Sequence, residues 1–460
     1  MIDDHLDTTE LTQLAGLLPD GAVVTDRDVI EGYRWDRAVD PNAGTPLAVV
    51  RPTTTEQVQA VVRWCGQTST PIITRGAGTS LSGGSTAVDG AIVLSTEKMR
   101  ELTIDTATRT AVVQPGLLNA EVKAAAAAEN LWYPPDPSSF EICSIGGNVA
   151  TNAGGLCCVK YGVTTDYVLG MQVVLADGRA VRLGGKQLKD SAGLSLTKLF
   201  VGSEGLLGII TEVTLRLLPP QAPACTVVGT FSSVHSASEA VLAITSQIRP
   251  AMLEFMDKVS INAVEDLLRM GLDREAGALL VAQSDAPGPA GVAEVAIIRE
   301  VFEKCGAAEV FDTEDAAEGE AFTAARRAAI PAVEKLGSLL LEDVGVPLPQ
   351  LPALIDGVGA IATRNEVMIS VIAHAGDGNT HPLIVFNPDD AAEAERAQRA
   401  FGQIMDLAIE LGGTITGEHG VGRLKKAWLP DQVGPDVMEL TAVIKNALDP
   451  QGLLNPGVIL

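Results

Sequence analysis

The sequence has few cysteines, and none of them occurs in a spacing that binds a metal cluster or haem. The six cysteines include no C-x-x-C pair, and they are Cys65, Cys143, Cys157, Cys158, Cys225 and Cys305. Iron–sulfur clusters and zinc ribbons need such closely spaced pairs, and attached haem needs C-x-x-C-H. The G-x-G-x-x-G fingerprint of nicotinamide-binding folds is also absent. These absences argue against a chain of redox centres built into one polypeptide.

Positive charge is scarce. The chain has 33 Lys and Arg against 58 Asp and Glu, which gives a formal net charge of -25. A surface of this sign repels phosphate backbones, so we expect no nucleic-acid partner. An anionic small molecule would need local cations or a bound metal to enter such a protein.

Long apolar runs are absent as well. No stretch reaches the roughly 20 residues that a membrane-spanning helix needs. The first ten residues, MIDDHLDTTE, are acidic and lack the basic and apolar regions of a secretory signal. We therefore expect a cytoplasmic protein with no transmembrane segment.

What is present is a long chain with two differently patterned parts. Its 460 residues are enough for two or three domains. From about residue 45 to 215 the chain is rich in glycine, with short β-branched runs such as LAVVRP and PIITRG. Within this part, residues 53–67 predict a helix capped by Thr, with its apolar residues on one face. The prolines of LLPPQAP, around Pro219, mark a domain boundary.

After this boundary strands and helices alternate, as in CTVVGTF followed by SASEAVLAITSQI. EVMISVIAH and HPLIVFN flank a Gly/Asp/Asn turn and predict a β-hairpin. Long helices are predicted through DAAEAERAQRAFGQIMDLAIEL and near the C-terminus. The pattern predicts an α+β second domain with a mainly antiparallel sheet.

Three glycine-rich segments carry the clearest binding signal. They are TRGAGTSLSGG at 74–84, PPDPSSFEICSIGGNVATNAGG at 134–155, and FVGSEGLLGIITEVTL at 200–215. Glycines let backbone N–H groups approach a phosphate closely, and the short polar residues between them reach a pyrophosphate, ribose or ring edge. The spacings match neither a Rossmann fingerprint nor a P-loop. Together the segments predict one extended ligand with two phosphates and a planar ring.

In their order, the three segments closely resemble the FAD domain of the vanillyl-alcohol oxidase fold. The resemblance is to the branch with D-lactate dehydrogenase, glycolate oxidase and D-2-hydroxyglutarate dehydrogenase, and it covers roughly residues 40 to 460. It implies an FAD-binding domain over 1–220 and a substrate (cap) domain with a metal site over 221–415. Residues 416–460 are then expected to return to the FAD domain.

The resemblance also implies the residues that hold FAD. The first loop would embrace the pyrophosphate, and its place for a flavin-linking histidine is taken by Thr79, so we expect non-covalent FAD. The residues expected along the cofactor are Arg75, Gly76, Ala77, Gly78, Thr79, Ser80, Leu81, Pro135, Asp136, Ser144, Gly147, Asn148, Thr151 and Asn152. Gly205 and Ile210 would lie near the adenosine half, and Asn455, in LLNPG, would return to the flavin.

Three of the five histidines lie in two glycine-containing motifs. The turn in HAGDGNTH brings His374 and His381 together, where two imidazoles can grip one divalent cation. In TGEHGVG, Glu418 and His419 would point to opposite faces of a regular strand, but the flanking glycines allow a loop in which both face one site. Hydrogen-bonded core histidines are the alternative interpretation. His5 and His235 are expected at the surface.

The chemistry of a hydroxy acid assigns roles to these groups. Hydride removal from a carbinol carbon also needs a base for the proton, and a Lewis acid lowers the pKa of the hydroxyl. We expect His374, His381 and Glu418 to bind a divalent metal, Zn or Mn, and His419 to act as the base. The family resemblance implies the same roles at these positions.

The resemblance further implies that Arg326 binds the substrate carboxylate, while its neighbour Arg327 is expected to be a solvated helix charge. The hydroxyglutarate branch carries a lysine where this chain has Leu341, so a monocarboxylate, D-lactate or glycolate, is favoured over D-2-hydroxyglutarate.

The electrons of the reduced flavin would pass to an external acceptor: a carrier protein, a partner subunit or a quinone. A non-catalytic flavin-binding subunit and a metallohydrolase are the competing interpretations. The oligomeric state stays open, with a homodimer as one alternative.

Overall fold

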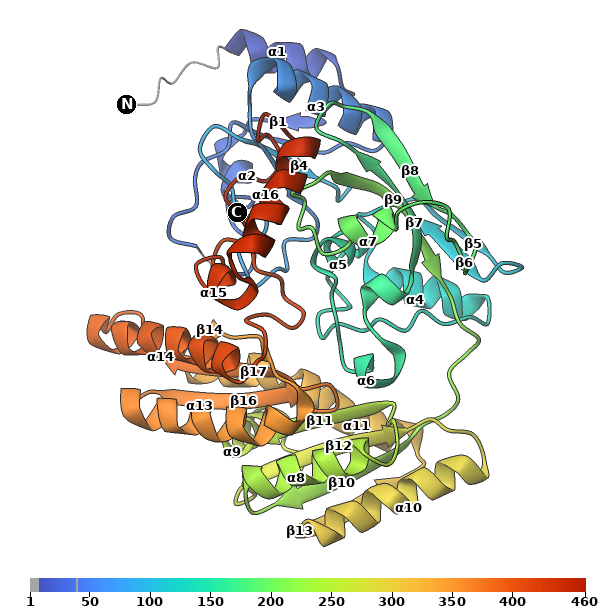
Figure 1. Ribbon diagram of the computed structural model, residues 1–460, viewed down its shortest axis with the longest axis vertical. Coiled ribbons are helices and arrows are strands. Elements are labelled where there is room, and N and C mark those ends of the chain that lie inside the picture. The colour runs from blue at the N-terminus through green and yellow to red at the C-terminus, as the bar shows by residue number, and fades with distance from the viewer. Residues whose placement is uncertain (1–7, 39) are drawn as a thin grey trace.

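The computed structural model of the protein describes residues 8–38 and 40–460. It has two parts (Figure 1). One part contains the N-terminal elements together with the C-terminal helix, and the other contains the elements between them. His5, expected at the surface, lies outside the described residues.

The first part contains a small sheet with the strand order β1-β2-β4-β3, in which β2, β4 and β3 run parallel. Its strands are β1 (Val23–Val24), β2 (Ala48–Val50), β3 (Ile72–Arg75) and β4 (Ile92–Ser95). Helix α3 (Thr55–Thr68) begins after Thr54, whose side chain accepts a hydrogen bond from the backbone N–H of Gln57. The helix buries Val58, Val61, Val62 and Cys65 on one face, as its sequence period predicts.

A second, antiparallel sheet of the first part has the order β5-β6-β9-β7-β8. Its strands are β5 (Leu102–Asp105), β6 (Thr110–Val113), β7 (Val168–Val174), β8 (Ala180–Gly184) and β9 (Ile209–Arg216). The helices of this part are α1 (Thr8–Gly16), α2 (Arg27–Glu31), α4 (Asn119–Ala128), α5 (Ile145–Thr151), α6 (Cys158–Tyr161) and α7 (Leu196–Phe200). The glycine-rich segments leave β3, enter α5 and enter β9, so all three lie at element ends.

The second part is built on one antiparallel sheet, as the alternating pattern predicted. Its strand order is β13-β10-β12-β11-β16-β17-β14, with β15 also paired to β17. The strands are β10 (Cys225–Phe231), β11 (Met252–Asp257), β12 (Ala278–Ser284), β13 (Ala307–Thr313), β14 (Ser338–Leu341), β15 (Val344–Gly345), β16 (Met368–His374) and β17 (Asn379–Phe386).

Helices cover both faces of this sheet. One face packs against α8 (Val234–Thr245), α10 (Pro289–Lys304), α13 (Leu351–Asn365) and α14 (Ala391–Glu410). The other packs against α9 (Lys258–Leu268), α11 (Ala316–Arg327) and α12 (Ala329–Val333). Successive strand residues point to opposite faces of the sheet. Leu253 belongs to the hydrophobic cluster with α8, α10, α13 and α14, and Met252 to the cluster with α9, α11 and α12.

The C-terminal tail returns to the first part, as Figure 1 shows for α16 (Pro435–Leu448), which follows α15 (Leu429–Val433). The Nζ of Lys445 donates hydrogen bonds to the carbonyls of Leu206 and Leu454. Leu454 forms a parallel bridge with Ile72, at the start of β3. The tail is therefore fixed beside the glycine-rich loop that follows β3.

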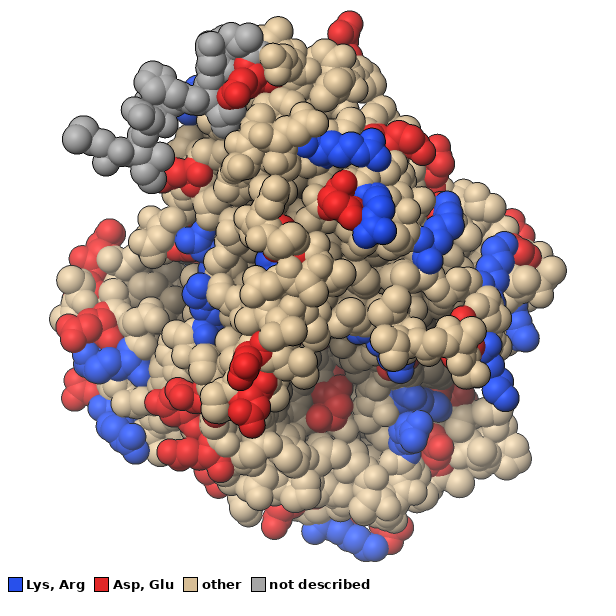
Figure 2. Space-filling model, turned by 45° about the horizontal axis from the view of Figure 1, so that its top comes forward, with Lys and Arg blue, Asp and Glu red and all other residues tan. Residues whose placement is uncertain are grey.

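No helix in the described part of the chain is long and apolar enough to cross a membrane. On the face shown in Figure 2, Lys and Arg side chains are interspersed with Asp and Glu. This face therefore has no continuous basic patch, in agreement with the net charge of -25.

Candidate functional site

A cavity of about 600 Å³ lies where the three glycine-rich segments meet the second part of the structure. Its other walls come from α11, α12 and the loop that carries Glu418 and His419. The expected cofactor residues in its lining are Gly76, Ala77, Gly78, Thr79, Ser80, Leu81, Ser144, Gly147, Asn148, Thr151, Gly205 and Ile210. The segments that the sequence singled out therefore surround one space.

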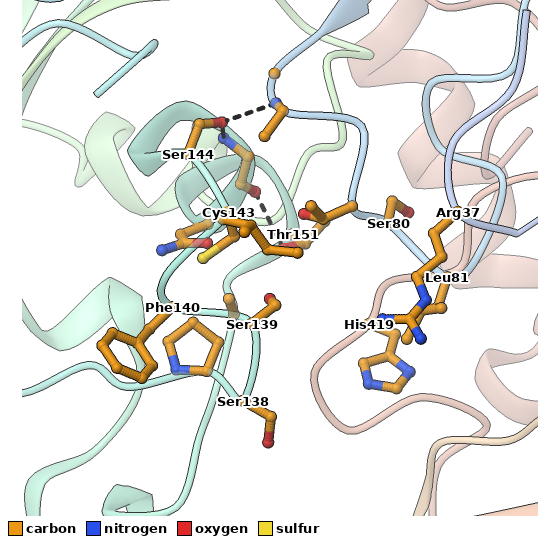
Figure 3. A pocket seen from close by; sticks show the side chains of 18 of the residues that line it. Arg37, Ser80, Leu81, Ser138, Ser139, Phe140, Cys143, Ser144, Thr151 and His419 are labelled. Carbon is orange, nitrogen blue, oxygen red and sulfur yellow. Dashed lines mark hydrogen bonds between the residues drawn. The ribbon is translucent and has the colours of Figure 1, made fainter. Parts of the chain in front are cut away.

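The first two segments are joined by one hydroxyl group. The Oγ of Ser144 accepts hydrogen bonds from the backbone N–H groups of Ala77 (3.2 Å) and Gly147 (3.3 Å), drawn in Figure 3. A Cβ on Gly76 would lie 2.4 Å from this Oγ, so only glycine allows the approach. The close contact leaves the backbone of both segments facing the cavity.

Five of the expected cofactor residues lie outside the cavity lining: Arg75, Pro135, Asp136, Asn152 and Asn455. The guanidinium of Arg75 donates to the carbonyl of Trp35 and lies beneath Gly78, where a Cβ would meet it at 2.1 Å. The amide of Asn455 donates to the carbonyls of Gly84 and Glu204. The side chains of Arg75 and Asn455 therefore support the glycine-rich loops without lining the cavity.

The other three make local contacts. The carbonyl of Pro135 accepts from Asn119, and the Asp136 carboxylate accepts from the backbone N–H of Cys157. Asn152 ends α5 in the left-handed conformation and accepts from the backbone N–H of Thr165.

The hairpin of β16 and β17 places two histidines on one face of the sheet. Ile372 is the register partner of His381, and His374 lies two residues along from Ile372 on the same face. The Oε1 of Glu418 lies 3.2 Å from the Nε2 of His374 and 3.3 Å from the Nε2 of His381. The hairpin expectation is confirmed, and the two motifs meet at Glu418.

Each of these imidazoles turns its other nitrogen toward a buried carboxylate. The Nδ1 of His374 lies 2.9 Å from Glu254 Oε1, and the Nδ1 of His381 lies 3.7 Å from Asp343 Oδ1. In metal sites, carboxylates in such positions fix the tautomer and orientation of the ligating imidazole.

The donor set fits a divalent cation. One ligand atom each from His374, His381 and Glu418 lies within 4.8 Å of the other two, and all three groups are buried or nearly so. Two imidazole nitrogens and one carboxylate oxygen suit Zn²⁺ or Mn²⁺. The Oε2 of Glu418 is buried without a hydrogen-bond partner, which leaves an acceptor free for such an ion.

The surroundings shift the pKa values of His374 and His419 in opposite directions. Burial acts to lower the pKa of His374, but the carboxylates of Glu254 and Glu418 outweigh it and raise that pKa well above its ordinary value. Burial lowers the pKa of His419 to about 4. The His419 side chain is therefore a neutral imidazole at neutral pH, the form in which it can accept a proton.

His419 and Glu418 both line the main cavity, as expected for an irregular loop. In Figure 3, His419 lies beside Arg37 and Leu81, across the cavity from Phe140. His374 lines instead a second cavity of about 480 Å³, which Glu418 also borders. The histidine cluster thus separates the two cavities.

Three arginines line the main cavity: Arg37, Arg326 and Arg327. Arg326 is 2% exposed, and its Nε lies 2.9 Å from Glu254 Oε2, while its Nη2 is buried without a partner. Arg327, expected to be a solvated helix charge, is partly so: its side chain is 23% exposed and donates to Glu320, while its guanidinium also packs over the ring of Phe140. Arg37 forms an ion pair with Glu334 of the second part.

Sequence reasoning missed Glu254 and Asp343, which support the site from behind, and Arg37. Glu254 and Asp343 are acids within otherwise apolar stretches, MLEFMD and LLLEDVGVP. Because an acid is rarely buried without a partner, such positions are a signal that could have found both.

The chain matches two family models. The first, described as "FAD binding domain", covers residues 46–184, and the second, "FAD linked oxidases, C-terminal domain", covers residues 220–459. The relatives include "Glycolate oxidase subunit GlcD" of Bacillus subtilis, 40% identical over 92% of this chain and 91% of the relative. "D-lactate dehydrogenase" of Archaeoglobus fulgidus is 33% identical over 93% of this chain and 95% of the relative.

Solved structures share the fold at low identity. p-Cresol methylhydroxylase with substrate bound superimposes with a TM-score of 0.81 at 19% identity, covering 98% of this chain and 96% of that one. A 4-ethylphenol oxidase from Gulosibacter chungangensis has the same TM-score at 17% identity, covering 99% and 98%. The expected α+β fold with an FAD-binding domain of the vanillyl-alcohol oxidase type is thereby confirmed.

The matched family models are described by FAD binding and FAD-linked oxidation, the relatives are named glycolate oxidase subunit and D-lactate dehydrogenase, and most of the cavity-lining residues lie in the two matched segments. The chain is therefore an FAD-linked oxidoreductase that belongs to the FAD-linked D-2-hydroxy acid dehydrogenase family, with glycolate oxidase subunits and D-lactate dehydrogenases among its relatives.

Proposed function

We propose that this chain oxidises a small D-2-hydroxy acid, with glycolate and D-lactate as the favoured substrates, to the 2-oxo acid. One observation carries the proposal: His381, Glu418, His419 and Arg326 line the cavity that the glycine-rich segments surround, and His374 completes the ligand cluster with His381 and Glu418. When bound there, FAD supplies the two-electron acceptor of the reaction.

His419 takes the role of general base. Its imidazole is neutral, lines the cavity and sits next to Glu418. A neutral imidazole within reach of the substrate can remove the hydroxyl proton as the C–H hydride leaves. His374, His381 and Glu418 would hold a divalent cation, which when bound supplies a Lewis acid for the substrate oxygens.

Arg326 takes the substrate carboxylate. Its Nη2 is buried, unpartnered and in the cavity lining, so an incoming carboxylate would satisfy it. The ion pair with Glu254 leaves less freedom to the guanidinium, so the substrate is oriented as well as bound.

The family resemblance favours a monocarboxylate over a dicarboxylate, because this chain has an apolar residue where the hydroxyglutarate branch carries a lysine. Leu341, at the position of the lysine in the hydroxyglutarate branch, packs against the hydrophobic cluster that contains Leu383 and Val385. D-2-Hydroxyglutarate stays a second candidate because Arg327 also lines the cavity and could hold a second carboxylate. The two candidates therefore differ in whether Arg327 contacts substrate.

Electrons would leave through an external acceptor. The relatives named glycolate oxidase subunit suggest a partner subunit for this chain as well, with a carrier protein or a quinone as alternatives. A cytoplasmic location is proposed on the sequence alone.

Anaerobic flavin bleaching tests the proposal. Purified FAD-loaded protein is mixed with glycolate, D-lactate, L-lactate and D-2-hydroxyglutarate, and the visible flavin absorbance is followed. We expect rapid bleaching by glycolate and D-lactate, slow bleaching by L-lactate, and a loss of any D-2-hydroxyglutarate reaction in Arg327→Met. Absence of bleaching by every hydroxy acid would leave a non-catalytic flavin-binding subunit as the better interpretation.

A further inference from the structure

The carboxylate of Asp343 is fully buried directly behind the loop that carries Glu418 and His419. Its Oδ2 accepts four hydrogen bonds. They come from the Oγ1 of Thr416 (2.7 Å) and the backbone N–H groups of Gly417 (3.0 Å), Glu418 (3.0 Å) and His419 (2.8 Å). One oxygen atom therefore gathers three successive backbone donors and a hydroxyl.

Three successive N–H groups can meet at one oxygen only if the chain curls around it, which makes a nest for an anion. The curl needs small residues. A Cβ on Gly417 would lie 2.3 Å from the side chain of Asn379, and Gly420 has φ +88°. Because the chain curls, Glu418 and His419 both face the cavity, whereas neighbours on a strand face opposite sides.

The Asp343 carboxylate also faces two imidazoles. Its Oδ1 lies 3.7 Å from the Nδ1 of His381, and its Oδ2 lies 3.9 Å from the Nδ1 of His419. Both Nδ1 atoms and the Oδ1 are buried without hydrogen-bond partners. These distances are longer than a hydrogen bond, and catalytic contacts of this kind often shorten into hydrogen bonds when the site is filled.

We propose that Asp343 is a positioning residue for the reaction: it sets the conformation of the loop that presents Glu418 and His419, and it orients the imidazoles of His381 and His419 from behind. The roles of those three groups rest on the proposed function, but the effect of Asp343 on the loop does not. No proton or electron passes to Asp343 in this scheme.

The chain supplies a matched control in the neighbouring residue. Glu342 is as fully buried as Asp343, but both of its carboxylate oxygens lack hydrogen-bond partners, and its nearest cation is Lys425 Nζ at 3.8 Å. Asp343→Asn and Glu342→Gln each replace one carboxylate by an amide of the same shape. Only the first substitution removes charge from the oxygens that hold the loop.

The test compares both variants with the wild type, all loaded with FAD. Hydrogen–deuterium exchange reports on the amides of Gly417, Glu418 and His419, and titration with Zn²⁺ reports on the metal site. In Asp343→Asn we expect these amides to exchange at least about tenfold faster. We expect the Kd for Zn²⁺ to rise about 10–100-fold.

Anaerobic flavin reduction by D-lactate or glycolate supplies the reaction readout. The limiting rate should fall about 10²-fold in Asp343→Asn, because misplaced catalytic groups slow the step, while the substrate concentration at half-saturation changes much less. Glu342→Gln should stay within about twofold of the wild type in all three readouts. Equal behaviour of the two variants would overturn the proposal.

Thr416→Val keeps the proposal testable if Asp343→Asn does not fold. It removes one of the four hydrogen bonds to the carboxylate, together with the bond that Thr416 Oγ1 accepts from the backbone N–H of Gly420, and leaves the carboxylate in place. Exchange of the same amides should still become faster and flavin reduction should still slow, each by about 3–10-fold, which corresponds to the net contribution of a typical hydrogen bond. Wild-type values in both readouts would overturn the proposal. If none of the hydroxy acids reduces the flavin of the wild type, the proposed function fails. The exchange and Zn²⁺ measurements then still decide the role of Asp343 in the loop.

Discussion

The Nδ1 of His374 lies 2.9 Å from one carboxylate oxygen of Glu254 and 3.0 Å from the other, while its Nε2 faces Glu418 at 3.2 Å. The second oxygen of Glu254 also lies 2.9 Å from the Nε of Arg326. One buried carboxylate therefore joins a proposed metal ligand to the proposed substrate-binding arginine. A change at Glu254 should affect both.

We predict that Glu254→Gln weakens the binding of metal and substrate together. Loss of the carboxylate removes the orienting partner of His374, which commonly costs about 10–100-fold in metal affinity. It also leaves the buried guanidinium of Arg326 without its counter-ion, so the KM for D-lactate or glycolate should rise. Zn²⁺ titration and steady-state kinetics with an artificial acceptor measure the two effects.

Asp257→Asn is the matched control for this prediction. Asp257 ends the same strand, β11, and its buried carboxylate accepts hydrogen bonds from Ser260, Ser370 and the backbone of Val371. It does not line the cavity. The control should lower thermal stability but leave the Kd for Zn²⁺ near the wild-type value, and an equal rise of that Kd in both variants would contradict a specific role for Glu254.

We predict that His419→Ala abolishes flavin reduction by substrate while FAD stays bound. Removal of a general base commonly slows a reaction by about 10²–10⁴-fold. The flavin spectrum reports retention of FAD, and anaerobic stopped-flow mixing reports the reduction rate. His235→Ala serves as the control because its side chain is exposed, and near-normal bleaching in His419→Ala would remove this residue from the role of base.

Local sequence patterns predicted the elements that carry the site but not the side chains that support it. The Thr-capped helix before β3 and the histidine hairpin follow from periodicity and turn chemistry within a short stretch. The contact of Glu254 with His374 joins residues 120 positions apart, and that of Asp343 with His419 spans 76. No local pattern specifies which distant partner a buried acid will find.

Contacts between residues far apart in sequence also explain why some of the predicted residues do not face the cavity. Arg75 lies between cavity-lining residues, and Asn455 contacts two of them, Gly84 and Glu204, yet both side chains donate to backbone carbonyls and neither lines the cavity. For Arg327, a helix position beside Arg326 suggested solvent, whereas the ring of Phe140, far away in sequence, packs against the guanidinium and the side chain is only 23% exposed. Chain order indicates which segments assemble, and packing decides which atoms face the space between them.

We predict that removal of the divalent cation lowers activity reversibly. The His374, His381 and Glu418 ligand set supports this expectation. Prolonged treatment with EDTA should reduce flavin bleaching by D-lactate, and Zn²⁺ or Mn²⁺ should restore it, as the Irving–Williams series and the N,N,O donors allow. Metal analysis of each preparation is the check: a fully active preparation without bound cation would refute the metal site.

The last prediction concerns the dependence of stability on pH. Burial raises the pKa of Glu342 to about 8 from an ordinary value of 4.5, although Lys425 acts in the opposite direction. The folded protein therefore keeps a proton on Glu342 that the unfolded chain releases between these two values. The resulting stabilisation is fully present below pH 4.5 and is lost as the pH rises through about 8.

In Glu342→Gln the side chain at position 342 cannot ionise, so the variant does not lose stability in this way as the pH rises. We expect the Tm of the variant to be close to that of the wild type, or below it, near about pH 5, and to rise relative to the wild type by about pH 8.5. Thermal unfolding of both proteins at fixed ionic strength and saturating FAD measures the difference at each pH. If the difference in Tm does not change with pH, Glu342 ionises in the folded protein as it does in the unfolded chain, and its ion pair with Lys425 compensates for burial.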